Sequence, residues 1–165
     1  MEITSQLQLK LALEERISKS MKDLENHIYE TVDKFLQEFY GEFTPVMYVR
    51  TKQFLHSLVA TDIVYTGKGF EFKVYIDYSK VNYRQKKVRV NNIVYTMENK
   101  GLSDEEIMNR NLQGYHGRVK GTSICEKALR ELMPNIVSRL KSYMKANGIP
   151  VKWDMSVVVK ATLFL

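Results

Sequence analysis

The residues best suited to a specific chemical role lie in one stretch, residues 43–58, between a helical region and a strand-rich region. Arg50 carries a planar fork of donors that can reach a carboxylate, a carbonyl or a partner chain, and Tyr48 supplies a ring that packs. Thr51 and Ser57 add polar groups at fixed spacing. This pattern is compatible with contact with a partner protein. The more common explanation is an amphipathic helix whose arginine is merely solvated.

No pair of side chains in the sequence is spaced for nucleophilic catalysis. Ser57 follows His56 directly, but adjacent residues of a helix point about 100° apart, so the hydroxyl and the imidazole diverge. His116 lies beside Gly117, and no second histidine or cysteine stands at the spacing of a metal site. The sequence therefore predicts a protein that is not an enzyme and has no metal or cofactor. His116 is a candidate contact between subunits.

A basic segment carries five positive side chains, with no acidic residue from Ser79 to Met97. The five are Lys80, Arg84, Lys86, Lys87 and Arg89, interleaved with Tyr78 and Tyr83. Such a segment can lie along phosphates, where each neutralised charge adds binding through counterion release. More commonly it is a solvated hairpin tip or an edge strand that positive charge protects from aggregation. In a ring, it could face a lumen through which DNA passes.

Composition narrows the class of protein. A chain of 165 residues with 27% charged and 44% hydrophobic residues predicts one folded domain with a real core. The net charge of +6 suits solubility, an acidic partner or nucleic acid. A single cysteine, Cys125, excludes an internal disulfide and indicates a reducing compartment. No apolar run approaches the roughly 18 residues that span a bilayer, so we expect neither membrane insertion nor export.

The strongest periodic signal predicts a long helix over residues 1–41. Apolar residues recur there at steps of three and four, as one face of a helix requires. They are Leu9, Leu13, Ile17, Met21, Leu24, Ile28, Val32, Phe35 and Phe39. The opposite, solvated face includes Glu25 and Glu30. The first turns, with Leu7 and Leu11 as well, are expected either to lie against another subunit, or to fray or fold back on their own core.

The remaining elements follow from local patterns. Pro45, with Thr44 as N-cap, predicts a second helix over residues 43–58. Strands are expected over residues 59–97. There, residues 61–65 and 70–78 pair antiparallel around the glycines of residues 67–69, and a third strand over residues 88–95 contains a bulge or turn at Asn91-Asn92.

Residues 98–121 are expected to form a loop or arm with one helical turn, capped by Ser103 and Glu106. A helix over residues 122–147 starts at Ser123 and is kinked or split at Pro134. A final strand over residues 151–165 returns to the sheet. The prediction is therefore an α+β fold in one domain: a long N-terminal helix, an antiparallel sheet of about four strands, and a C-terminal helix packed on the sheet.

From about Tyr40 to Pro150, the chain resembles the small tail-completion or head–tail joining proteins of tailed bacteriophages. Arg50-Thr51 followed by Leu55 and Ser57 is similar to that family's Arg-Thr-Gly-x-Leu-x-x-Ser element, with Lys52 in place of the glycine and a shorter leucine-to-serine spacing. The resemblance also covers the order of elements and a set of single residues. These are Tyr40, Pro45, Tyr48, His116-Gly117 and the helix end at Gly148-Ile-Pro150.

The resemblance implies a structural protein of the virion without catalysis, assembled in the cytoplasm of a bacterial host. Such subunits form rings, commonly of six copies, between the head connector or adaptor and the tail tube or tail terminator. The implied partners are copies of the chain itself and these neighbours, with a possible passing contact with DNA and none with a membrane. The alternative that the residues leave open is a small basic nucleic-acid-binding module.

Overall fold

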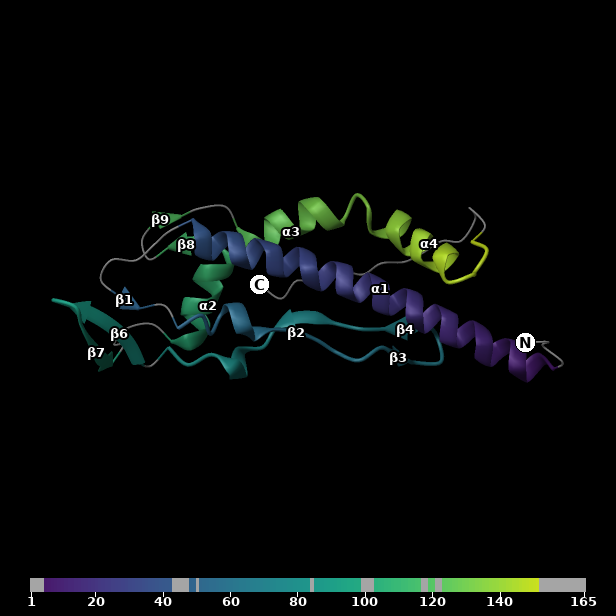
Figure 1. The fold of residues 1–165 in the computed structure, drawn as a ribbon, viewed down its shortest axis with the longest axis horizontal. Helices are drawn as coiled ribbons and strands as arrows, with labels where there is room; N and C mark the ends of the chain where they lie inside the picture. The colour runs from purple at the N-terminus through teal and green to yellow at the C-terminus, as the bar shows by residue number, and fades with distance from the viewer. Residues whose placement is uncertain are drawn as a thin grey trace.

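A single long helix, α1 (Gln6–Gly41), runs along most of the molecule, which is elongated (Figure 1). The computed structural model describes residues 5–42, 48–49, 51–83, 85–98, 103–116, 119–120 and 123–151. Ser5 caps α1, since its hydroxyl accepts a hydrogen bond from the Gln8 amide at 3.2 Å. The predicted helix and the α+β class are confirmed.

The buried face of α1 is wider than the predicted stripe. Glu25, expected on the solvated face, is only 2% exposed, and Lys22 donates to its carboxylate at 2.6 Å. The physical reason is that α1 is covered on two sides, by helices on one and by strands on the other (Figure 1). Ser20 and Thr31 are also buried, and each donates to the backbone carbonyl four residues earlier.

The stretch predicted to be a second helix has another structure where it is described. It contains β1 (Tyr48–Val49), the 3-10 turn η1 (Leu55–Ser57) and β2 (Leu58–Ala60). Lys52 has a φ of 57°, which a right-handed helix does not permit. The backbone of β1 instead pairs with a distant strand, so non-local pairing outweighs the local apolar spacing. Thr44 and Pro45 lie outside the described residues.

The predicted antiparallel pairing of the next strands is confirmed, in two parts. β2 pairs with β5 (Val74–Ile76), and β3 (Val64–Tyr65) pairs with β4 (Phe70–Glu71) around Gly67, whose φ is 80°. The connecting segments have unequal lengths, residues 61–63 against 72–73. Thr61 bridges this mismatch, because its hydroxyl accepts from the Lys73 amide at 2.9 Å while its own amide donates to the Lys73 carbonyl.

The predicted third strand is a hairpin of two strands, β6 (Gln85–Val90) and β7 (Ile93–Glu98). Asn91 and Asn92 both have positive φ, 48° and 64°, as a two-residue hairpin turn requires. Of the two alternatives at this position, the turn is therefore the observed one. With β1 on the other edge of β6, the hairpin forms a three-stranded sheet. The described strands thus form several small sheets in place of one sheet of about four strands.

The segment predicted as a loop or arm is more ordered than expected. It contains α2 (Asp104–Leu112) and a short hairpin of β8 (Tyr115–His116) and β9 (Val119–Lys120). The predicted capping box is present, since the Ser103 hydroxyl accepts from the Glu106 amide and the Glu106 carboxylate accepts from the Ser103 amide. The capping interaction with Ser103 lowers the pKa of Glu106.

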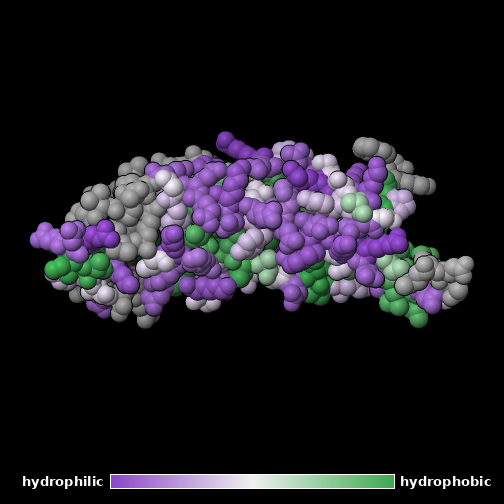
Figure 2. Space-filling view, viewed as in Figure 1, coloured by the Kyte–Doolittle hydropathy of each residue, from purple (hydrophilic) through white to green (hydrophobic). Residues whose placement is uncertain are grey.

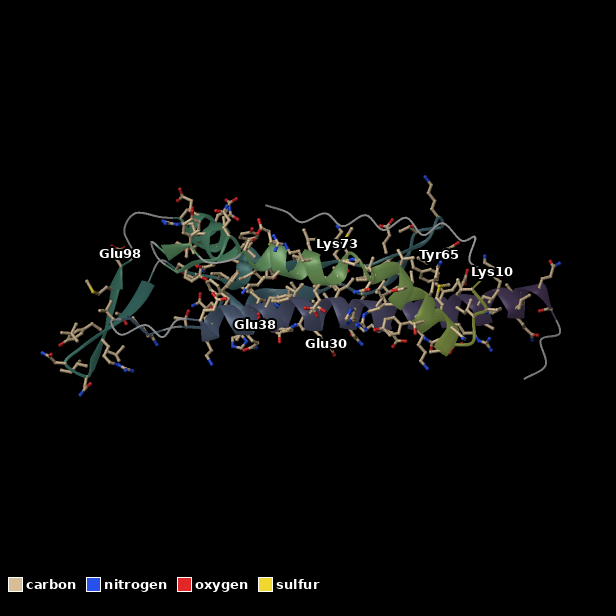
Figure 3. All side chains as sticks on the ribbon, turned by 90° about the horizontal axis from the view of Figure 1, so that it is seen from above. Lys10, Glu30, Glu38, Tyr65, Lys73 and Glu98 are labelled. Atoms are coloured by element: carbon tan, nitrogen blue, oxygen red, sulfur yellow. The ribbon has the colours of Figure 1, made fainter. Side chains whose placement is uncertain are left out.

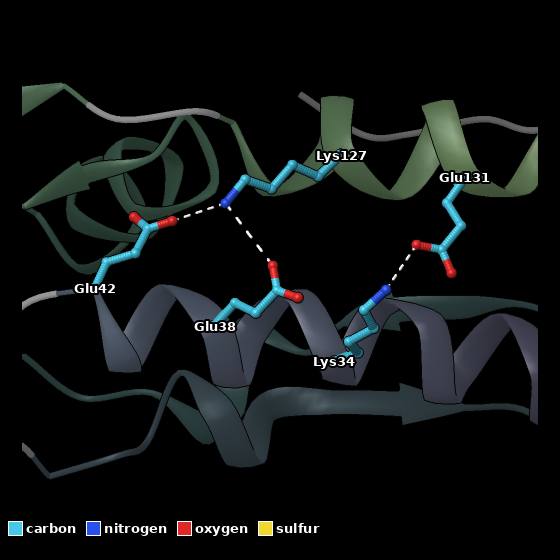
Figure 4. Close-up of polar contacts among 5 residues, drawn as sticks. All are labelled: Lys34, Glu38, Glu42, Lys127 and Glu131. Carbon is cyan, nitrogen blue, oxygen red and sulfur yellow. Dashed lines mark hydrogen bonds and ion pairs between the residues drawn. The ribbon is translucent and has the colours of Figure 1, made fainter.

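The C-terminal helical region is split at Pro134, as predicted, into α3 (Ile124–Leu132) and α4 (Ile136–Ala146). Both helices pack along α1, which lies between them and the strands (Figure 1). Among the described residues, three ion pairs join α3 to α1 and its C-cap: Lys127 lies 2.7 Å from Glu42 and 4.0 Å from Glu38, and Lys34 lies 2.9 Å from Glu131 (Figure 4). The final strand predicted over residues 151–165 falls, except for Val151, outside the described residues.

Two hydrophobic clusters lie one after the other along the length of α1. One joins the C-terminal half of α1 to η1, α2 and α3, with Phe54 fully buried and in edge-to-face contact with Phe39. The other joins Leu24 of α1 to α4. Asn147, at the end of α4, donates to the Ser20 hydroxyl at 3.2 Å and to the Asp23 carboxylate at 2.9 Å. No described helix is long and apolar enough to cross a membrane.

We expect Phe54→Ala to lower the free energy of unfolding by about 3–5 kcal/mol, because it removes a fully buried ring and leaves a cavity. Val64→Ala, at an exposed strand position, is the matched control and should change stability by less than about 0.5 kcal/mol. Urea unfolding followed by circular dichroism measures both. Equal stabilities for the two variants would show that Phe54 does not hold the first cluster together.

Candidate interaction surfaces

Of the residues predicted to act together in the stretch 48–57, Ser57 does not reach the surface of the subunit. Ser57 is fully buried, and its hydroxyl donates to the Phe54 carbonyl at 2.7 Å, which stabilises the η1 turn. His56 beside it is exposed, so the two side chains diverge as expected. Thr51 is exposed, the backbone of Tyr48 pairs with Val88, and Arg50 lies outside the described residues. Ser57 therefore has no free surface in the single subunit to offer a neighbour.

His116 belongs to the short hairpin of β8 and β9, where its backbone is opposite Val119. Among the described residues, no group of three or more His, Cys, Asp or Glu side chains is placed to bind a metal ion. Cys125 is buried within the first cluster, and that burial raises the pKa of its thiol. A buried thiol of this kind behaves as a small apolar side chain.

Over half of its length the basic segment is a strand, and this strand, β6, lies between β1 and β7 and not at the edge of the sheet. Lys80 is exposed in the 3-10 turn η2 (Tyr78–Lys80), and Lys87 and Arg89 are exposed on β6. The backbone of Lys86 is opposite Met97 on β7, and Arg84 lies outside the described residues. The positive side chains thus follow one hairpin and the turn before it.

The register of this hairpin separates its residues into two faces, because cross-strand partners share a face. Lys87 pairs with Thr96 and Arg89 with Val94, so this face is mainly polar and basic. The other face is mainly apolar. By the register it includes Val88, Val90, Ile93, Tyr95 and Met97, and the backbone of Lys86 is opposite Met97. Every residue of β7 is exposed, so this apolar face is left open to solvent in the single subunit. We call it the hairpin apolar face.

A second open apolar surface lies at the other end of the molecule. The first turns of α1 expose four leucines: Leu7 at 66%, Leu9 at 46%, Leu11 at 56% and Leu13 at 37%. Figure 2 shows hydrophobic surface gathered at both ends, with a largely hydrophilic face between them. Figure 3 places Lys10 of α1 and Glu98 of the hairpin at opposite ends of the long axis. Sequence reasoning identified the leucines but not the hairpin apolar face.

Helix α2 positions the base of the hairpin through polar contacts that the sequence did not reveal. The Asp104 carboxylate accepts from the Tyr83 amide at 2.8 Å, and the Asn111 amide donates to the Tyr83 hydroxyl at 3.3 Å. Burial raises the pKa of Tyr83 well above its usual range. The Tyr78 hydroxyl donates to Asn109 at 3.2 Å. These contacts tie the chain just before β6 to α2.

His27 gives the fold a dependence on pH. Burial on α1, together with the positive charge of Arg139 on α4, lowers the pKa of His27 below its ordinary value of 6.5, against the opposing effect of Glu30 and Glu131. Because the unfolded chain then binds the proton more readily than the folded chain, stability falls as the pH drops below about 6.5.

We expect His27→Gln to flatten the decline in stability between pH 6.5 and the lower folded pKa, because the residue that takes up the proton is gone. The free energy of unfolding, measured by urea titration at several pH values, gives the comparison with the wild type. His56→Gln, at an exposed position, is the matched control and should keep the wild-type slope. If His27→Gln leaves the dependence of stability on pH unchanged, His27 is not the cause of that dependence.

The comparisons with known proteins give one family. A model of the YomN family matches residues 5–146, which include α1, the hairpin of β6 and β7, and α2 to α4. No curated protein and no solved structure matches the chain significantly. The match covers most of the sequence, and the family name is that of a phage-derived protein. The chain therefore belongs to the YomN family and is a phage-associated protein.

Proposed function

We propose that the chain is a structural subunit of a phage particle that assembles into a ring at the junction of head and tail, as a tail-completion or head–tail joining component. The observation that carries the proposal is the exposure of apolar side chains at both ends of an elongated subunit (Figure 2). Open apolar patches of this kind mark surfaces that bind other proteins.

The positions of the two patches favour a ring. The α1 leucines and the hairpin apolar face are different surfaces, and they lie at opposite ends (Figure 1). A subunit with more than one open patch can bind a neighbouring copy on each side, and such contacts close into a ring when the rotation between neighbours permits. The resemblance to head–tail joining proteins supports six copies, with the head connector or adaptor on one side and the tail tube or tail terminator on the other.

In this proposal the protein acts through binding and has no catalytic role. Tyr48, Arg50, Thr51 and His116 remain proposed contacts with neighbouring subunits, and the virion is the proposed location. Thr51 is the one whose side chain the structure describes, and it is exposed. Ser57 supports the turn from within the subunit.

We expect Tyr95→Lys to reduce self-association, because it places a charge in the hairpin apolar face. Thr96→Lys is the matched control, since Thr96 is the next residue, is equally exposed and lies on the opposite face of the hairpin. Light scattering after size-exclusion chromatography measures the mass of the assembly, and circular dichroism confirms the fold. A wild-type protein that is monomeric at every concentration and absent from phage particles would contradict the proposal.

A second candidate function, a nucleic-acid-binding module, is favoured by one observation. Lys87 and Arg89 are exposed on one face of β6, with Lys80 exposed nearby in sequence. Positive side chains on an open ribbon suit the phosphate backbone. In a ring, the same face could line the lumen, where DNA passes without sequence-specific contacts.

The two functions differ in how binding depends on salt. A binding module should hold DNA at physiological salt and lose affinity steeply as salt rises, whereas a ring subunit should bind weakly. We expect weak binding that Lys87→Glu together with Arg89→Glu abolishes, while Lys68→Glu, exposed at the β3–β4 turn, leaves it unchanged. Fluorescence anisotropy with labelled duplex DNA measures this. Tight binding by a monomer would favour the module.

A further inference from the structure

We infer that the first turns of α1 make a two-sided contact between copies of this chain, in which the Leu7 and Leu11 side of one copy packs against the Leu9 and Leu13 side of the next. The inference rests on the proposed self-association and adds to it the surface, the partner and the orientation. The partner on each side is another copy of the same helical segment.

The spacing of the leucines places them on two sides of the helix. Leu7 and Leu11 are four residues apart and share one side, as do Leu9 and Leu13. At 3.6 residues per turn, the two sides are roughly 160° apart. A helix that faces only its own core carries one apolar stripe, whereas a helix that is apolar on opposite sides is buried on both. The segment is therefore suited to lie between two neighbours.

The exposure of the leucines shows that the subunit itself does not cover either side. Leu7 and Leu11 are 66% and 56% exposed, and Leu9 and Leu13, on the side that continues the core-facing stripe, are still 46% and 37% exposed. The N-terminal turns of α1 extend beyond α4 and the β3–β4 hairpin (Figure 1). Arg16 lies near the edge of the packed body, where its Nη1 donates to the Gly148 carbonyl at 3.1 Å.

Charges beside the leucines make the two sides complementary. Glu15 follows Leu11 by four residues and so extends the Leu7 and Leu11 side with a negative charge. Arg16 follows Leu13 by three residues and extends the other side with a positive charge. Both side chains are exposed. A guanidinium has five N–H donors, so the contact of Arg16 with Gly148 leaves others for a carboxylate.

In a ring, one leucine side of each copy faces the other leucine side of the next copy, and the facing residues lie at nearly the same height along the helix. The proposed contact places α1 along the axis of the ring, so neighbouring α1 helices run parallel. Leu7, Leu11 and Glu15 of one copy then face Leu9, Leu13 and Arg16 of the next, with offsets of one or two residues, at most about 3 Å along the helix. The apolar contact supplies most of the binding, and the charge pair fixes orientation and register.

The same geometry argues against a membrane surface as the partner. A helix that lies on a bilayer has its apolar residues on a single face and positive charge on the other. Here the apolar residues occupy nearly opposite sides, and Glu15 stands beside one of them.

Charge reversal in the full-length chain tests the contact. Glu15→Arg places two arginines at each interface, and Arg16→Glu places two glutamates there, so each variant should need about tenfold more protein for half-assembly. The double variant Glu15→Arg/Arg16→Glu should assemble like the wild type, because the pair is restored with its signs exchanged. An equimolar mixture of the two single variants should assemble as well. Light scattering over a concentration series measures each case.

The controls are Glu30→Arg and Lys19→Glu, which make the same charge changes at exposed positions of α1 away from both leucine sides. Both should assemble like the wild type. If the wild type assembles and the single reversals have no effect, or if neither the double variant nor the mixture restores assembly, this contact is wrong while the proposed function stands. A wild type that never assembles overturns both.

A cross-link measures the orientation independently. Leu11→Cys mixed with Leu13→Cys should form a disulfide-linked pair under mild oxidation, and each variant alone should form much less. Cys125 is buried, so the wild-type chain should form few disulfide-linked pairs and serves as the background measurement. Efficient cross-linking of Leu11→Cys with itself would indicate a symmetric pair and overturn the inference. Sedimentation of the wild type with phosphatidylglycerol vesicles would indicate a membrane partner and overturn it as well.

Discussion

The structure depends on the burial of a broad face of α1 between two layers, α3 and α4 on one side and the β2–β5 strands on the other (Figure 1). Each layer alone covers only part of that face, and each hydrophobic cluster includes residues of α1. Removing apolar area from water is the main stabilising term, so the helix that contributes to both clusters contributes most to stability. Surface ion pairs such as Lys127 with Glu42 add little to this.

Features encoded by neighbouring residues were predictable from the sequence. The 3.6-residue period of α1, the capping box at Ser103 and the break at Pro134 all follow from local rules, and the structure confirms each of them. The stretch 43–58 was misjudged because its apolar spacing suits a helix, whereas its structure depends on the positive φ of Lys52 and on pairing with β6, far along the chain. No local sequence pattern indicates pairing between strands that are far apart in the chain.

The candidate surfaces were predictable only in part, for a similar reason. The leucines of α1 were identified because a helix this long extends past what a small domain can cover. The hairpin apolar face was missed because Asn91-Asn92 is a weaker turn signal than Asn-Gly, so a bulge and a turn were both left open at this position. Once that turn is known, the register places Lys87 and Arg89 on the face opposite the hairpin apolar face. Glu25 was assigned to solvent because spacing along a helix does not reveal how many layers cover it.

The continuity of α1 has a mechanical consequence. Its 36 residues form an uninterrupted rod about 54 Å long, with no proline or internal glycine at which it could bend. Both hydrophobic clusters hold this one helix, so the two ends of the subunit are kept at a fixed separation.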